Sequence, residues 1–89
     1  MAAPAISAAN MAVILRAQAD GFRLIRDAEA KKWQRAMDDQ DDDAERHHNR
    51  EYERADALAM LLDAQSEKAE AEAAIEKAEA RLRELEAQR

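Results

Sequence analysis

Residues 22–89 read FRLIRDAEAKKWQRAMDDQDDDAERHHNREYERADALAMLLDAQSEKAEAEAAIEKAEARLRELEAQR, and these 68 residues contain neither glycine nor proline. The only glycine of the chain is Gly21 and its only proline is Pro4. Tight turns and β-hairpins depend on residues that reach positive φ or that fix φ. A long stretch without them predicts helix almost end to end. We therefore expect an all-α protein built from two long helices with coiled-coil packing.

The composition predicts that one copy of the chain has a thin core. Of the 89 residues 23 are alanine, which leaves only 19 larger apolar residues. Alanine is the best helix former but contributes little apolar area. Cysteine is absent, so disulfides and thiolate metal sites are excluded. Since a short chain with a thin core usually needs a partner, we expect an oligomer.

Residues 1–37 are predicted to form an amphipathic helix that begins near Pro4 or with Ser7 as its N-cap. Its apolar arc covers about half of the circumference, more than one neighbouring helix covers. Gly21 lies within the arc and is either a tolerated weak point or a site of close backbone approach. The arc contains Met11, Ile14, Leu15, Gln18, Phe22, Ile25, Trp33 and Ala36, flanked by Ile6, Val13, Ala17, Leu24 and Ala28.

Residues 38–43 are predicted to connect two helices. This segment holds five aspartates. Aspartates at a helix C-terminus oppose the helix dipole, whereas aspartates ahead of a helix stabilise its first turn. We therefore expect a bend or a short connection, which gives a helical hairpin or a bent rod. The alternative is one unbroken helix about 130 Å long.

Residues 44–89 are predicted to form a coiled-coil helix with a heptad seam. The seam consists of Ala57, Leu61, Ala64, Lys68, Ala71, Ile75, Ala78, Leu82 and Leu85. A second stripe runs beside the first half of the seam and contains Tyr52, Ala55, Leu58, Leu62 and Ala69. In an antiparallel hairpin we expect the first helix to pack on Tyr52, Leu58, Leu61 and Leu62. Residues 75–85 then pair with the N-terminal end or with another subunit.

One set of side chains has the pattern of a metal site. Glu45 and His48 are spaced Glu-x-x-His, and Glu29 on the first helix supplies a further carboxylate. Di-iron proteins of the ferritin type combine such groups on packed helices. On these three residues and the hairpin outline, the chain resembles the short, two-helix encapsulated ferritins. The resemblance implies a metal-binding helical oligomer with Glu29, Glu45 and His48 as ligands. The competing interpretation is that the histidines are surface residues at the start of a helix.

Several classes of function are disfavoured by the residues present. The chain has no cysteine or threonine, and Ser7 and Ser66 are its only serines, so a nucleophilic enzyme is not expected and no cofactor is predicted. A net charge of −6 disfavours nucleic-acid binding. Residues 1–37 carry a local excess of basic side chains, which leaves contact with an anionic membrane surface as an alternative.

We expect a non-enzymatic structural or assembly protein that binds copies of itself and other subunits. In general character the chain looks like the small helical components of tailed-phage particles, of the ejection or inner-core type, or of a secretion apparatus. No signal peptide or transmembrane segment is apparent, which favours the cytoplasm or the interior of a large assembly. A second alternative is a small phage-encoded inhibitor whose acidic connection binds a host protein. The predicted interface residues are Ile14, Leu15, Phe22, Ile25, Trp33, Leu61, Leu62, Ile75, Leu82 and Leu85.

Overall fold

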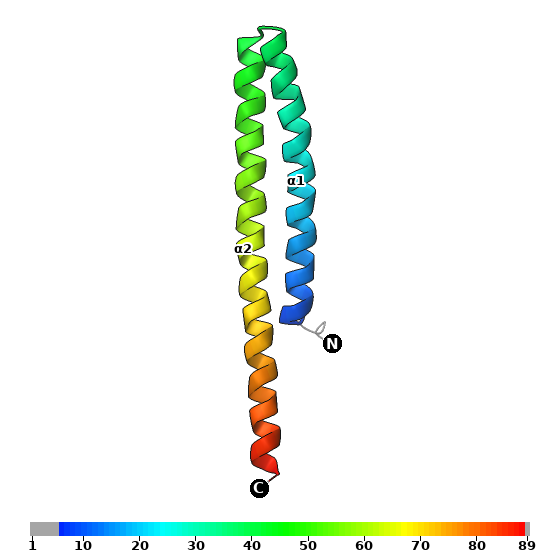
Figure 1. Ribbon diagram of the computed structural model, residues 1–89, viewed down its shortest axis with the longest axis vertical. Helices are drawn as coiled ribbons and strands as arrows, with labels where there is room; N and C mark the ends of the chain where they lie inside the picture. Colours follow the sequence, from blue (N-terminus) through cyan, green and yellow to red (C-terminus); the bar gives the residue numbers. More distant parts are fainter. Residues whose placement is uncertain (1–5, 89) are drawn as a thin grey trace, which may run out of the picture.

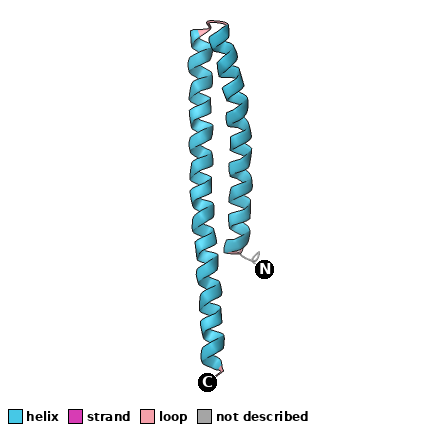
Figure 2. Ribbon diagram, viewed as in Figure 1, coloured by secondary structure: helices cyan, strands magenta, loops and turns pink. Residues whose placement is uncertain are grey.

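The computed structural model describes residues 6–88 and shows an antiparallel helical hairpin about 74 Å long (Figure 1). Helix α1 spans Ala8–Asp38 and helix α2 spans Asp42–Ala87. No strand occurs among residues 6–88, where the two helices are the only regular elements (Figure 2). The prediction of an all-α hairpin is confirmed, and the single unbroken helix is wrong.

Both helices begin at residues whose side chains cap them. The Ser7 hydroxyl accepts a hydrogen bond from the backbone N–H of Asn10 at 3.2 Å, so α1 starts with the predicted serine N-cap. The alternative start at Pro4 lies outside the described residues. In α2 the Asp41 carboxylate accepts from the backbone N–H of Ala44 at 3.1 Å. Asp42, Asp43 and Glu45 follow in the first turn, where negative charge is favourable to the helix dipole.

The connection is shorter than residues 38–43, because Asp38 ends α1 and Asp42 already belongs to α2. Gln40 adopts a left-handed conformation with φ of 55°. Its backbone N–H donates to the carbonyl of Met37, and that of Asp41 donates to the carbonyl of Ala36. These two bonds form a Schellman motif, which usually has glycine at the position of Gln40. The chain therefore makes a tight reversal without glycine, at the cost of a strained residue.

Replacing Gln40 with glycine is expected to stabilise the hairpin by about 0.5–1 kcal/mol, because glycine adopts positive φ without a steric penalty. The free energy of unfolding from urea denaturation measures this gain. Gln65→Gly is the control, because Gln65 lies inside α2 and the same change there should destabilise the hairpin by a similar amount. An unchanged or lower stability of Gln40→Gly would show that the turn is not strained.

The two helices meet along a seam of small side chains. The fully buried residues are Ala12, Ala19, Ala36, Ala55, Ala59, Ser66 and Ala69, and none is larger than serine. In α2 these residues share a heptad stripe with half-buried Tyr52 and Leu62. Most of the predicted second stripe is therefore the hairpin seam. The predicted first seam, from Ala57 to Leu85, is exposed throughout.

At Ser66 the two helices approach each other closely. Its side chain has 0% exposure, and its hydroxyl donates to the backbone carbonyl of Ala12 at 2.8 Å. A side chain as short as serine reaches the main chain of another helix only when the two backbones are close together. A larger residue does not fit at the position of Ser66, so the large apolar side chains cannot all lie between α1 and α2.

Enlarging Ser66 should therefore open the seam. Ser66→Leu is expected to lower the free energy of unfolding by about 1–3 kcal/mol through overpacking. Ser66→Ala should cost less, about 0.5 kcal/mol, because the lost hydrogen bond is partly offset by the higher helix propensity of alanine. Gln65→Leu, one residue away and exposed, is the control for added apolar area. Equal stability of Ser66→Leu and Gln65→Leu would contradict a tight seam.

Helix α2 is longer than α1 and runs past its N-terminal end (Figure 1). Toward the C-terminus of α2, the last hydrogen bond and the last ion pair to α1 among the described residues are those of Ser66 with Ala12 and of Glu70 with Arg16. From Ala74 to Gln88 every residue is exposed except half-buried Ala80. We call residues 74–88 the extension of α2. Most of it runs past the N-terminal end of α1 (Figure 1).

Candidate functional site

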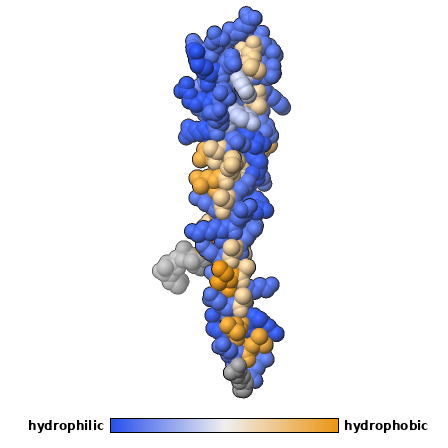
Figure 3. All heavy atoms as spheres, turned by 60° about the vertical axis from the view of Figure 1, so that its left-hand side comes forward, coloured by the Kyte–Doolittle hydropathy of each residue, from blue (hydrophilic) through white to orange (hydrophobic). Residues whose placement is uncertain are grey.

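Most large apolar side chains lie on the surface of the hairpin. Leu24 is 73% exposed and Ile25 is 51% exposed, although the seam between the helices is buried. Figure 3, in which the α2 side comes forward, shows apolar groups gathered in patches along this face to its C-terminal end. The exposed set is Ile6, Met11, Val13, Ile14, Leu24, Ile25, Met37, Met60, Leu61, Ile75, Leu82 and Leu85.

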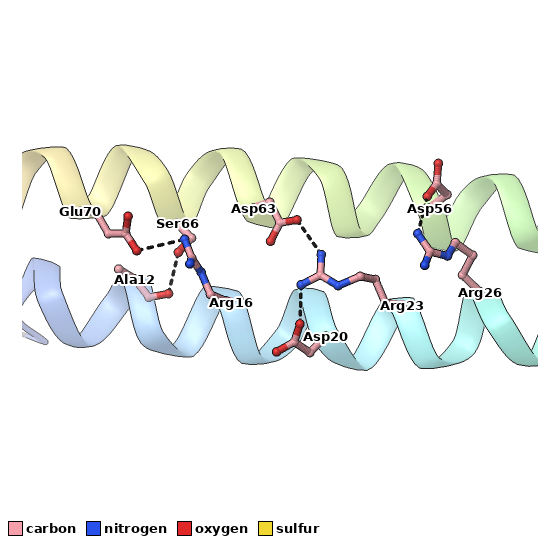
Figure 4. A network of polar contacts seen from close by, with 9 residues as sticks. All are labelled: Ala12, Arg16, Asp20, Arg23, Arg26, Asp56, Asp63, Ser66 and Glu70. Atoms are coloured by element: carbon pink, nitrogen blue, oxygen red, sulfur yellow. Dashed lines mark hydrogen bonds and ion pairs between the residues drawn. The ribbon is translucent and has the colours of Figure 1, made fainter.

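One side of the hairpin is closed by ion pairs that cross from α1 to α2 (Figure 4). The pairs are Arg16 with Glu70 at 3.0 Å, Arg23 with Asp63 at 2.6 Å, and Arg26 with Asp56 at 3.0 Å. Asp56, Asp63 and Glu70 directly follow the seam residues Ala55, Leu62 and Ala69, so all three lie on the same flank of α2. We call this row of six charged residues the ionic side.

Two arginines of the ionic side, Arg23 and Arg26, are each held by two carboxylates. Arg23 also pairs with Asp20, and Arg26 pairs with Asp27 on its own helix. The hydrogen bonds that Arg23 donates to Asp20 and Asp63 raise the pKa of Arg23, and those that Arg26 donates to Asp56 and Asp27 raise the pKa of Arg26. Exposed pairs of this kind add little stability. The charged groups do keep this side of the hairpin hydrated, and a hydrated, charged surface is unfavourable for binding an apolar partner.

The opposite flank of the seam is apolar. Leu58 directly precedes the seam residue Ala59, and Ile25 occupies the equivalent heptad position in α1, six residues after the seam residue Ala19. The position before the seam lies on the other flank from the position after it. A groove of about 230 Å³ lies here between the helices. It is lined by Phe22, Ile25, Glu51, Arg54, Ala55 and Leu58. Ile14 lies three residues from Met11 and Leu61 three from Leu58, which places them on the same face.

We call this flank the apolar side and define it by Met11, Ile14, Ile25, Leu58 and Leu61. Gly21 lies on it, and a Cβ added to Gly21 meets nothing within 4 Å. Gly21 is therefore not a site of close approach between α1 and α2. A shallow groove lined by Gln18, Gly21, Phe22 and Ile25 continues the apolar side along α1.

The structure divides the predicted interface residues into two groups. Leu15, Phe22, Trp33 and Leu62 are half-buried, and the Trp33 ring is tilted by 42° against the Tyr52 ring with the ring centroids 6.3 Å apart. The remaining six are exposed, namely Ile14, Ile25, Leu61, Ile75, Leu82 and Leu85. The expectation that Leu61 packs against the first helix is wrong. Leu61 lies two residues beyond the seam residue Ala59, on the solvent face of α2.

The seam residues Ala12, Ala19, Ala59 and Ser66 were not predicted from the sequence. The predicted interface was based on the large apolar residues. A stripe of alanines is not detected in this way when leucines and isoleucines lie next to it in the sequence. The signal that identifies the seam is the regular heptad spacing of small residues in both helices. This spacing runs through Ala12 and Ala19 in α1 and through Ala55, Ala59, Ser66 and Ala69 in α2.

Two of the three metal-ligand candidates lie side by side. His48 Nδ1 is 2.7 Å from Glu29 Oε2, and Lys32 Nζ lies 3.4 Å from the other Glu29 oxygen. Glu45 is half-buried in the first turn of α2. Among residues 6–88 no three histidine, aspartate or glutamate side chains gather closely enough to hold a metal ion. Within one chain, Glu29 and His48 form a contact between the helices.

The Glu29 contact predicts a dependence of stability on acid pH. Hydrogen bonding to His48 is the main cause that lowers the pKa of Glu29 below its ordinary value of 4.5. The contribution of Glu29 is therefore present above that value and is lost as the pH falls through the lower native pKa. The difference in free energy of unfolding between the wild type and Glu29→Gln should shrink from about pH 7 to about pH 3.

Glu53→Gln is the matched control, since Glu53 is exposed on α2. The difference in free energy of unfolding between Glu53→Gln and the wild type should vary less over the same range of pH. A difference for Glu29→Gln that stays constant with pH would show that the contact with His48 contributes nothing.

The acidic residues Asp39, Asp41, Asp42 and Asp43 are all exposed at the turn end of the hairpin. Among the described residues no helix is long and apolar enough to cross a membrane. Comparison with models of protein families, with curated proteins and with solved structures found no match for this chain.

Proposed function

We propose that the protein is a structural subunit, not an enzyme, and that it assembles with copies of itself through the apolar side. The observation that carries this proposal is the asymmetry of the hairpin. Ion pairs occupy one flank of the seam, and the other flank presents Met11, Ile14, Ile25 and Leu61 to water. An apolar face bordered by charged residues is typical of a protein interface.

A second copy of the same hairpin suits this face. Two hairpins that meet by their apolar sides form a four-helix bundle, in which side chains on facing helices make the core. A two-fold axis uses the same patch on both subunits, so the face needs no other partner. Each α1 then has a second helical neighbour, as the width of its apolar arc predicts. The tailed-phage particle or secretion apparatus suggested by the composition is a setting in which such bundles serve as building units.

The proposal predicts that substitutions at the neighbouring residues Ile25 and Leu24 affect assembly differently. Ile25→Gln should weaken assembly, because Ile25 lines the groove of the apolar side. A loss of about 1–3 kcal/mol per dimer corresponds to a shift of the dissociation midpoint by roughly one to two orders of magnitude in concentration. Sedimentation equilibrium over a range of protein concentrations measures this shift.

Leu24→Gln is the matched control. Leu24 is 73% exposed, neighbours Ile25 in sequence and lies outside the apolar side. Its removal should leave the midpoint unchanged. Equal effects of the two substitutions would locate the interface elsewhere, and a wild type that is monomeric at every concentration would refute self-assembly.

A further inference from the structure

The extension of α2 carries an apolar stripe that nothing in the described chain covers. Ile75 and Leu82 are each 56% exposed, and Leu85 is 47% exposed. With Ala78 they follow steps of three and four residues, which is the a and d pattern of a coiled coil. Ile75 and Leu82 follow Leu61 at multiples of seven residues. The stripe is therefore in the same heptad phase as Leu61 of the apolar side of the hairpin.

We infer that two copies of the extension pair as a parallel, in-register coiled coil. The inference rests on the proposed self-assembly and adds the direction and register of the pairing. The stripe places Ile75 and Leu82 at a, and Ala78 and Leu85 at d. The β-branched Ile75 at position a and Leu85 at position d are compatible with a two-stranded parallel coil.

Charges beside the stripe select the parallel direction. In this register Arg81 occupies position g and Glu79 and Glu86 occupy position e. In a parallel coil each g residue faces the e residue of the next heptad on the other helix, so Arg81 faces Glu86 of the second copy twice per dimer. In an antiparallel coil g faces g and e faces e, which sets like charges against each other.

The contacts of Arg81 within its own chain do not prevent this pairing. Arg81 Nη1 lies 3.4 Å from Glu84 Oε2 one turn away, and both side chains are about two-thirds exposed. Such an exposed pair between neighbouring turns is weak. Replacing the Arg81–Glu84 ion pair with a pair between Arg81 and Glu86 of a second copy therefore costs little free energy.

The inferred coil ends toward the hairpin near Lys68. Lys68 occupies an a position, and Glu67 and Glu72 occupy g and e positions that face each other in a parallel pair. Two negative charges there repel, although Lys68 lies between them and offsets part of the repulsion. The favourable part of the coil is therefore short, from Ile75 to Leu85. It depends on the apolar sides of the two hairpins to hold the copies together.

Single introduced cysteines test the direction and register. The chain has no cysteine of its own, so each introduced thiol is unique. Ala78→Cys places thiols at facing d positions of a parallel, in-register dimer. Mild oxidation should convert most of this variant to a disulfide-linked dimer. Ala80→Cys lies two residues further along the helix and outside the stripe. This variant should form the disulfide-linked dimer at least tenfold more slowly under the same conditions.

Charge reversal gives an independent readout. Arg81→Glu and Glu86→Arg should each weaken self-association by setting like charges against each other. An equimolar mixture of the two variants should form heterodimers in preference to homodimers, since both facing pairs are then opposite in charge. Native mass spectrometry measures the proportion of heterodimer, which is half for random mixing.

The outcomes separate the two proposals. If the wild type assembles but Ala78→Cys oxidises no faster than Ala80→Cys, or if the charge variants mix at random, the parallel coil is wrong and self-assembly stands. If the wild type is a monomer, both proposals fail. Rapid oxidation of Ala78→Cys together with preferred heterodimers supports the parallel coil.

Discussion

The close approach of α1 and α2 along a seam of alanine and serine determines the rest of the structure. Ser66 hydrogen-bonds directly to the backbone of α1, and no fully buried residue is larger than Ser66. A seam of this kind provides good helix propensity and close backbone packing but buries little apolar area. The larger side chains consequently lie beside the seam or outside it. The hairpin is thus a well-defined unit that still exposes much of its apolar surface.

The two flanks of the seam differ in chemistry. Arg16, Arg23 and Arg26 form ion pairs across the helices on one flank, while Ile25 and Leu58 lie on the other. The ion pairs contribute little to the stability of the hairpin. Their main effect is on which flank an apolar partner can bind, because a charged and hydrated flank disfavours such partners. In the proposed assembly, this arrangement directs the contacts to a single side and gives the hairpin a defined orientation relative to a second copy.

The sequence predicted two long helices joined as a hairpin or a bent rod, and a first helix that begins near Pro4 or with Ser7 as its N-cap, because the absence of glycine and proline and the position of the aspartates act locally. It failed to distinguish the two stripes of α2. Leu61, Ile75 and Leu82 form a stronger hydrophobic pattern than Ala59 and Ser66, yet the helices pack through the weaker one. That choice depends on how closely two backbones can approach, which is a tertiary property. The left-handed Gln40 was likewise invisible, since the Schellman motif usually carries glycine.

The central claim is that one hairpin is incomplete and is stabilised by a second copy on its apolar side. Sedimentation equilibrium of the wild type, with helicity followed by circular dichroism in the same dilution series, tests it most directly. The account predicts a mass of at least twice 10.0 kDa at high concentration and a joint loss of mass and helicity on dilution. A particle of 10.0 kDa that keeps full helicity and melts cooperatively at the lowest concentration would contradict it.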